Sequence, residues 1–422
     1  MNFKLNLLSF GKLLVLIFVL YTGWFRYAYG IRQILLYAPP IALTATILLH
    51  MITHGNLNIR GCPSIIIAFF ALAIYAFASG NIVAVNKSYC ISSVATFFAH
   101  SLICFAVYYI SKEEKSINWI LNILIICGIL CSAYAYLRGI ARKTSGVDAI
   151  VLGEANNPNF LGMVMLTSIF ALIYDFDKFR KRMVLSTVLL AAFAGVVILT
   201  SSRECFLTLV ITVVWWIFAF MKALAKEEHS GGSIFHNSIY QIFILLGVGL
   251  SIVYFINNFE GTGVYTKIVN SITQGDGLNS RKLLYQEAWR LFKRHYPTGV
   301  GFDQFRFYTS SGFYRNMTFH GHYSHSTYAE IASCLGIFGI LIFFIPLGLG
   351  YLKTIAEFLK HRDYKISMLL IMFTAELMLG LGTIFIYEFY QMLILTIIFY
   401  ECQQIEKSNA KGEIYEKPHK KN

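Results

Sequence analysis

The chain has 422 residues, of which 57% are hydrophobic and 14% are charged, and its mean hydropathy is +0.60. A water-soluble globular protein of this size does not normally have so apolar a composition, so we expect a polytopic membrane protein. In such a protein the formal net charge of +13 indicates topology and attraction to anionic lipid, and we exclude nucleic acid as a partner.

Apolar windows long enough to cross a hydrocarbon core of about 30 Å recur along the chain. They predict an all-α fold of about twelve transmembrane helices in a single transmembrane domain, residues 1–422. No small-residue cleavage site follows the first window, so we expect it to remain as an anchor. The windows are 12–30, 33–51, 63–80, 90–110, 118–138, 159–175, 183–200, 204–221, 238–257, 326–352, 366–384 and 386–402.

Lysine and arginine are unevenly divided between the short connections. The segment FDKFRKRM (176–183) is the most basic of them and fixes the sixth connection as cytoplasmic. If the sixth connection is cytoplasmic and twelve helices cross the membrane, the N-terminus and the basic tail (403–422) are both expected to be cytoplasmic.

Two connections are long, and both are expected on the outer side. The first, from about residue 139 to residue 158, ends in a run of asparagines and a proline, from which we take Asn157 and Asn159 as candidate substrate-binding residues. The second is a loop of nearly 70 residues, 258–325, between the ninth and tenth windows. Long structured loops usually carry function.

Within this loop, NSRKLLYQEAWRLFKRHYP (279–297) predicts a short helix with Ser280 as its N-cap. The apolar stripe consists of Leu284, Ala288 and Leu291. The helix is too short and too charged to span a bilayer, so we expect it along the outer membrane surface. Arg281 and Lys282 occupy its first turn, where the helix dipole disfavours cations, so they either point into water or headgroups or meet another anion.

Arg203 begins the eighth window in LTSSRECFLTL, at the outer edge of the membrane. A lone arginine there can simply extend its charge into the interface. The positive-inside rule, however, would put a purely topological arginine on the other side. A functional role is therefore the second interpretation.

Three histidines, His320, His322 and His325, stand just before the tenth window. Their spacing is compatible with zinc, although the loop offers only scattered carboxylates as further ligands. They also suit acid–base chemistry, because imidazole accepts a proton near neutral pH. Hydrated loop histidines are the third interpretation.

Arg203, Arg281 and the histidines together describe one kind of substrate. Guanidinium groups bind phosphate oxygens bidentately and keep their charge, so they can stabilise a departing diphosphate. A base beside them can activate a hydroxyl. A lipid diphosphate donor at the membrane surface fits this description.

An ordered set of motifs supports this interpretation. The motifs are NNPNFLG (156–162), SSRECFL (201–207), SRKLLYQEAW (280–289), HYPTGVGFDQF (295–305) and HSTYAEIASCLGIFG (325–339). Over about residues 150 to 345 the sequence resembles the O-antigen ligase and O-antigen polymerase superfamily, bacterial membrane enzymes that move glycans from undecaprenyl diphosphate.

The resemblance implies a GT-C-like, metal-independent and cofactor-free inverting glycosyltransferase of the bacterial cytoplasmic (inner) membrane, with its site on the extracytoplasmic side. Arg203 and Arg281 are implied to hold the diphosphate, and His325 to be the base for the acceptor hydroxyl. We expect Glu330 either to orient His325 or to pair with an arginine. The substrate-binding candidates are His320, His322, Tyr285, Asn157, Asn159 and Glu330.

The implied donor is an undecaprenyl-diphosphate-linked oligosaccharide. We favour a repeat-unit polymerase for O-antigen, capsule or exopolysaccharide, with a chain-length regulator as a further partner. The alternatives are a ligase that uses a lipid A core acceptor, and a protein O-oligosaccharyltransferase. A polysaccharide transporter or flippase is the alternative from another class, but only Glu376 places a carboxylate deep in a window.

Overall fold

The computed structural model describes residues 6–29, 34–54, 61–144, 147–153, 157–229, 260–273, 278–310 and 321–410. In these ranges the chain is almost entirely helical, as expected for a protein whose backbone must satisfy its own hydrogen bonds in lipid. The long helices are α1 (Leu7–Leu20) with η1 (Tyr21–Phe25) and α2 (Arg26–Ala28), α3 (Ile34–Thr53), α4 (Ser64–Val83), α5 (Lys87–Glu114), α6 (Asn118–Arg138), α7 (Pro158–Ile173), α9 (Met183–Leu199), α10 (Arg203–His229), α15 (Thr327–His361), α16 (Tyr364–Gly382) and α17 (Phe389–Ala410).

Eight of the described helices are long and apolar enough to cross a membrane, and α7 and α9 are apolar but shorter. Eleven of the twelve hydropathy windows coincide with helices, and the window 238–257 lies outside the described residues. The prediction of an all-α, multi-pass membrane protein is therefore confirmed. The number twelve stays a prediction.

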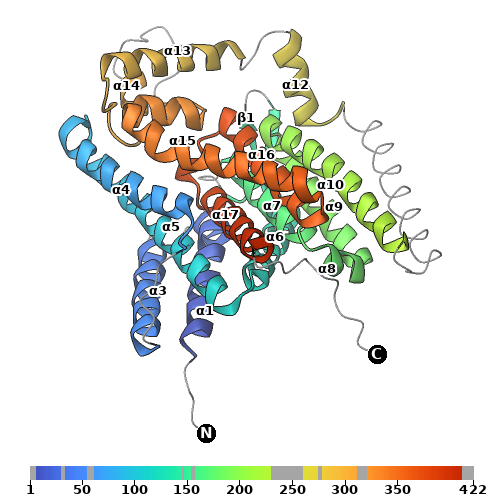
Figure 1. The fold of residues 1–422 in the computed structure, drawn as a ribbon. Coiled ribbons are helices and arrows are strands. Elements are labelled where there is room, and N and C mark those ends of the chain that lie inside the picture. The colour runs from blue at the N-terminus through green and yellow to red at the C-terminus, as the bar shows by residue number, and fades with distance from the viewer. Residues whose placement is uncertain are drawn as a thin grey trace.

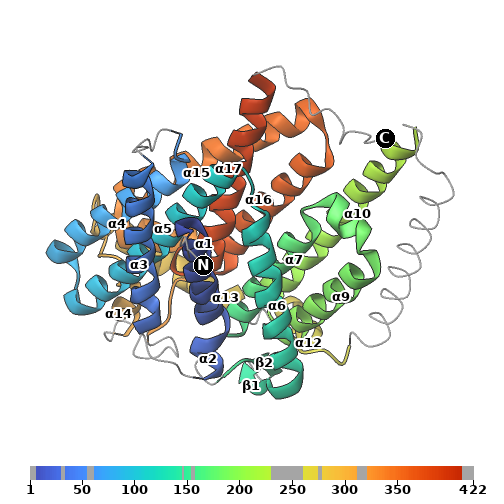
Figure 2. The ribbon, with the colours of Figure 1, turned by 90° about the horizontal axis from the view of Figure 1, so that it is seen from below.

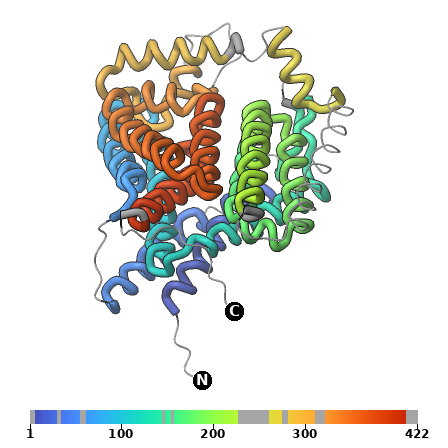
Figure 3. Tube along the Cα trace, turned by 45° about the vertical axis from the view of Figure 1, so that its right-hand side comes forward, coloured from blue at the N-terminus to red at the C-terminus, as the bar shows by residue number. Residues whose placement is uncertain are grey.

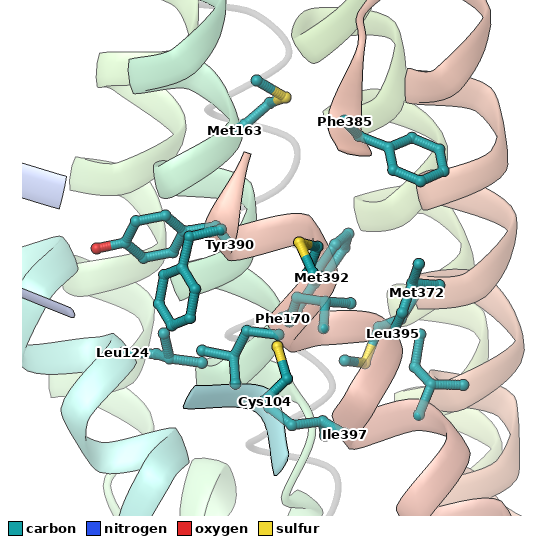
Figure 4. Packing of buried hydrophobic residues seen from close by; sticks show 14 of the residues in the cluster. Cys104, Leu124, Met163, Phe170, Met372, Phe385, Tyr390, Met392, Leu395 and Ile397 are labelled. Atoms are coloured by element: carbon teal, nitrogen blue, oxygen red, sulfur yellow. The ribbon is translucent and has the colours of Figure 1, made fainter. Parts of the chain in front are cut away.

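The helices form a bundle whose centre is occupied by α17 (Figure 1). Seen from below, α3, α4 and α5 lie on one flank and α9 and α10 on the other, with α6 and α7 between them (Figure 2). The core includes Phe170, Met372 and Tyr390, which belong to one cluster of buried side chains from α7, α16 and α17 (Figure 4). The Tyr390 hydroxyl also donates to the carbonyl oxygen of Val19 over 2.7 Å, which ties α17 to α1.

The remaining elements are short. The first long connection folds into an antiparallel hairpin of β1 (Ile140–Thr144) and β2 (Val147–Val151), which the sequence had not suggested. A single turn, α8 (Phe176–Lys181), joins α7 to α9. The described parts of the second connection form α12 (Gly263–Thr273), α13 (Leu278–Arg294) and α14 (Phe305–Ser310). These three helices cover one end of the bundle (Figures 1 and 3).

The helix expected in the long loop is present as α13, with two differences. It begins at Leu278, so Ser280 lies inside its first turn and the expected N-cap is wrong. Its stripe of Leu284, Ala288 and Leu291 is buried, and α13 packs on α15. The stripe is covered by protein, which explains why a helix with so little apolar surface is held in place.

A break in α15 receives the chain that follows α13. Gly336 has φ 62° and ψ −155°, a conformation open essentially to glycine. A Cβ at Gly336 would overlap the carbonyl oxygen of Pro297, which accepts a hydrogen bond from the Ile337 N–H at 3.0 Å. Two more backbone bonds complete the junction: Val300 N–H to Ser333 O at 3.0 Å and Gly301 N–H to Cys334 O at 2.8 Å. The glycine at position 336 is thus explained by backbone packing against Pro297.

Gly336→Ala should destabilise the protein strongly, because both the backbone conformation and the contact with Pro297 reject a methyl group. We expect a loss of about 3 kcal/mol or more in the free energy of unfolding, measured as the thermal unfolding of purified protein in detergent. Gly348→Ala is the matched control, since no atom lies within 4 Å of a Cβ built at Gly348 in the same helix. Equal stability of the two variants would contradict the assignment.

Candidate functional site

Arg203 lies in the first turn of α10 and reaches towards α12. Its Nη1 donates to the Ser271 hydroxyl and lies 3.4 Å from the carbonyl oxygen of Lys267. The guanidinium is therefore turned towards α12, where it has hydrogen-bond partners within the protein.

Arg281, in the first turn of α13, forms an ion pair with Glu204. Glu204 directly follows Arg203, and its side chain is only 13% exposed. This carboxylate is the anion that favours Arg281 at a helix N-terminus, where the dipole alone would disfavour a cation. Because Glu204 lies between the two arginines, it brings the start of α10 and the start of α13 together.

Lys267 of α12 is a third cation beside Arg203 and Arg281. We call these three residues the cationic cluster. Its Nζ donates to the carbonyl oxygen of Ser201 over 3.1 Å. Burial lowers the pKa of Lys267, and the neighbouring Arg203 lowers it further, while Glu204 opposes the shift. The sequence offered no sign of this residue except the amphipathic segment GVYTKIVNSIT that carries it.

His325 precedes α15 in a left-handed conformation, with φ 56°. The next residue, Ser326, caps the helix, and both the N–H and the hydroxyl of Thr327 donate to the carbonyl oxygen of Thr383, at 3.0 and 2.9 Å. Thr383 follows the end of α16, so this turn is fastened to the helix whose last residue, Gly382, packs directly on Glu204. The imidazole is thereby held next to the cationic cluster.

The protonation of His325 is set by these surroundings. Burial lowers its pKa to about 4, the positive charge of Arg281 and the neighbouring His322 contribute in the same direction, and Glu204 opposes them. The imidazole is therefore neutral at physiological pH, which is the form that can accept a proton.

Glu330 lies in the first turn of α15 and is fully buried. Its side chain contacts the segment that carries His325. Its carboxylate accepts hydrogen bonds from the N–H of Ser324 and from the hydroxyl of Tyr387, each at 3.1 Å. These contacts differ from both expected ones, with His325 itself or with an arginine. Glu330 acts on His325 through the backbone of the preceding residue.

The other candidate residues lie at different distances from the cluster. His322 is exposed, and its ring centroid is 6.2 Å from that of His325. Tyr285, one turn after Arg281, donates to the carbonyl oxygen of Leu381 over 2.8 Å and so joins α13 to α16. His320 lies outside the described residues.

Asn157 and Asn159 lie at the start of α7. The Asn157 side chain caps this helix by accepting from the N–H of Asn159 at 3.0 Å. The carbonyl oxygen of Asn159 accepts from the Cys205 thiol, at 3.6 Å. Both asparagines therefore have a structural role beside the first turn of α10.

Arg203, Arg281 and His325 come from three elements far apart in the chain, and Glu204 interacts electrostatically with all three. The helices α12 and α13 cover one end of the bundle (Figures 1 and 3). Among the described residues, no group of three or more His, Cys, Asp or Glu side chains is arranged to hold a metal ion. What the cluster offers is a concentration of positive charge beside a neutral imidazole.

A family model described as O-antigen ligase matches residues 187–344, the stretch that contains Arg203, Lys267, Arg281 and His325. This match supports the resemblance of this part of the chain to the O-antigen ligase/polymerase superfamily. No curated protein matches the chain. The match supports, in general terms, a glycan-transferring membrane enzyme with lipid-linked glycan substrates.

Removal of the Glu330 carboxylate should destabilise the turn that carries His325. Glu330→Ala leaves the buried groups of Ser324 and Tyr387 without their acceptor, at a cost of about 1–3 kcal/mol for each group. Tyr387→Phe removes only one hydrogen bond and should cost about 1 kcal/mol. Thermal unfolding of the purified variants measures the difference, and an Ala variant as stable as the Phe variant would contradict this role of Glu330.

The pH dependence of glycan transfer should reflect the low pKa of His325. As the pH falls, kcat/KM should be retained until about pH 4, because the imidazole in the free enzyme stays neutral down to that value. Between pH 6.5 and about 4 the unfolded chain takes up a proton at this residue that the folded protein does not, so stability falls over the same interval. An acid limb of kcat/KM close to 6.5 would show that His325 is unperturbed or is not the base.

Proposed function

We propose that this protein transfers an undecaprenyl-diphosphate-linked oligosaccharide to a glycan hydroxyl on the outer face of the cytoplasmic membrane, as a repeat-unit polymerase. The single observation that carries the proposal is the convergence of Arg203, Lys267 and Arg281 beside the neutral imidazole of His325. A departing diphosphate requires the cations, and an attacking hydroxyl requires the base.

The diphosphate would be bound by the two guanidinium groups, which match phosphate oxygens in pairs. Lys267 adds a point charge from α12. These groups are partly buried and are held by fixed partners. They therefore need little reorganisation when negative charge develops on the phosphate oxygen that separates from the anomeric carbon. The lipid tail of the donor would remain in the bilayer against the apolar helices.

The reaction would be a single displacement. The acceptor hydroxyl transfers its proton to the free nitrogen of His325 while its oxygen forms a bond to the anomeric carbon. The bond from that carbon to the diphosphate oxygen breaks at the same time, and the diphosphate leaves with the electron pair. The configuration at the anomeric carbon is inverted, and His325 then releases the proton to water.

A ligase is the second candidate, because the matched family model carries that description and the donor chemistry is the same. The two enzymes differ in the acceptor: a polymerase extends a glycan that is still linked to lipid diphosphate, whereas a ligase attaches it to a lipid A core. Reconstitution with both acceptors, followed by gel analysis of the products, separates the two functions. We favour the polymerase because no feature of the outer segments points to a particular ligase acceptor.

Loss of Arg281 or of His325 should strongly reduce transfer while the protein still inserts and accumulates. Arg281→Ala should reduce kcat by about 10²–10³, because one preorganised donor to the leaving group is lost. Arg281→Lys should recover little of this, since an ammonium cannot replace the bidentate fork. His325→Ala should cost about 10²–10⁴ through loss of the base. Product length and yield in proteoliposomes measure all three.

Lys282→Ala is the matched control for Arg281. Lys282 is exposed in the same turn of α13 and carries the same charge, so general attraction to the membrane surface would be reduced equally in both variants. Normal polymer yield from Arg281→Ala, or an equal loss from Lys282→Ala, would overturn the assignment of Arg281.

A further inference from the structure

Glu204 is the one residue beside the cationic cluster that does not fit a plain anion site. It places a negative charge beside Arg281 and within the electrostatic reach of Lys267 and His325. A carboxylate at this position repels the diphosphate that the proposed function requires. Its presence therefore calls for a physical reason.

The position of Glu204 is built into the fold. A Cβ at Gly382 would overlap its Cγ, so the end of α16 lies directly against its aliphatic stem. The Ser202 hydroxyl lies 3.5 Å from its Oε2, and only 13% of the side chain is exposed. Glu204 cannot simply swing into solvent when a phosphate arrives, so its charge remains part of the site in the presence of substrate.

The cluster has a definite charge when Glu204 is counted. Arg203, Lys267 and Arg281 supply three positive charges, Glu204 removes one, and His325 is neutral at physiological pH. Two positive charges remain. Without Glu204 there would be three.

The donor and the product of the proposed reaction differ in charge by one unit. In the donor both phosphates are esterified, by lipid and by sugar, so each carries one negative charge. After transfer the terminal phosphate is free and ionises a second time with a pKa of about 6. The product therefore carries close to three negative charges at neutral pH, and a purely cationic site would hold it more tightly than the donor.

We propose that Glu204 sets the selectivity of this site for a doubly esterified diphosphate over a diphosphate with a free terminal phosphate. The inference rests on the proposed function. The negative charge of Glu204 leaves the cluster with two net positive charges, which match the two negative charges of the donor. It also repels the third negative charge that appears on the product. Glu204 thus weakens product inhibition and favours release of the lipid diphosphate, while its contact with Arg281 keeps the guanidinium in position.

Glu204→Gln tests the proposal, because glutamine keeps the shape and an oxygen acceptor for Arg281 and removes only the charge. The two probes are farnesyl diphosphate, with a free terminal phosphate, and its P2-methyl ester, in which both phosphates are esterified. Their inhibition constants are measured against glycan transfer in detergent at fixed ionic strength, at about pH 8 where the terminal phosphate is fully ionised.

In Glu204→Gln the inhibition constant of farnesyl diphosphate should fall about tenfold more than that of the methyl ester, as expected for one extra charge a few ångströms away in a partly buried site. An unchanged ratio of the two constants would overturn the proposal. Such a result includes equal weakening of both probes, which would mean that Glu204 only holds Arg281 in place.

Glu260→Gln is the control, since it removes the same charge from an exposed residue just before α12 and should leave the ratio unchanged. Arg281→Ala separates this inference from the proposed function. Because this variant is expected to have little activity, its affinity for the two probes is measured by direct binding and compared with that of the unaltered protein. If Arg281→Ala weakens both probes but Glu204→Gln leaves their ratio unchanged, only the role of Glu204 is wrong. If Arg281→Ala weakens neither probe, the diphosphate assignment itself is wrong.

Discussion

The carbonyl oxygen of Pro297 occupies the space that a side chain would fill at Gly336, and this contact between two backbones holds the extramembrane segment to the transmembrane bundle. Pro297 follows the end of α13, which carries Arg281 near its start, and Gly336 lies in α15, which begins just after His325. The relative position of the guanidinium and the imidazole therefore depends on a junction made mainly of backbone groups. Tyr75 adds to it, because its hydroxyl lies within hydrogen-bond distance of the carbonyl oxygens of Thr298 and Leu335, at 3.2 and 3.1 Å. Backbone hydrogen bonds between residues 297–301 and 333–337 make the junction stiff, as a site that must be preorganised requires.

Electrostatics sets the second condition on the structure. Three cations held close together in partly buried positions repel one another, and the negative charge of Glu204 relieves this repulsion. Burial lowers the pKa of His325 most, and the positive charge of Arg281 lowers it further, so the imidazole is neutral. One cluster thus serves both halves of the proposed reaction: it attracts an anionic leaving group and prevents the base from being protonated in advance.

Several features could be read from the sequence because they depend on local composition. A run of about twenty apolar residues in lipid has to satisfy its backbone groups internally, so eleven windows coincide with helices. The stripe of α13 was recognised because its spacing of three and four residues is visible in the chain. Arg203, Arg281 and His325 were found because they lie in an ordered set of motifs. The start of α13 was misplaced, since a serine before an apolar run resembles an N-cap whether or not the helix begins there.

The sequence by itself therefore determined the class of protein, the helical segments and three of the residues that meet at the candidate site. Only the tertiary structure decided which charges face one another: Glu204 turns towards Arg281, Lys267 joins from a helix without a motif, and Glu330 supports His325 through Ser324 and Tyr387. The physical reason is that each of these contacts joins groups on different elements or across a sharp turn. Local propensity and hydropathy carry no information about which surfaces of those elements will meet.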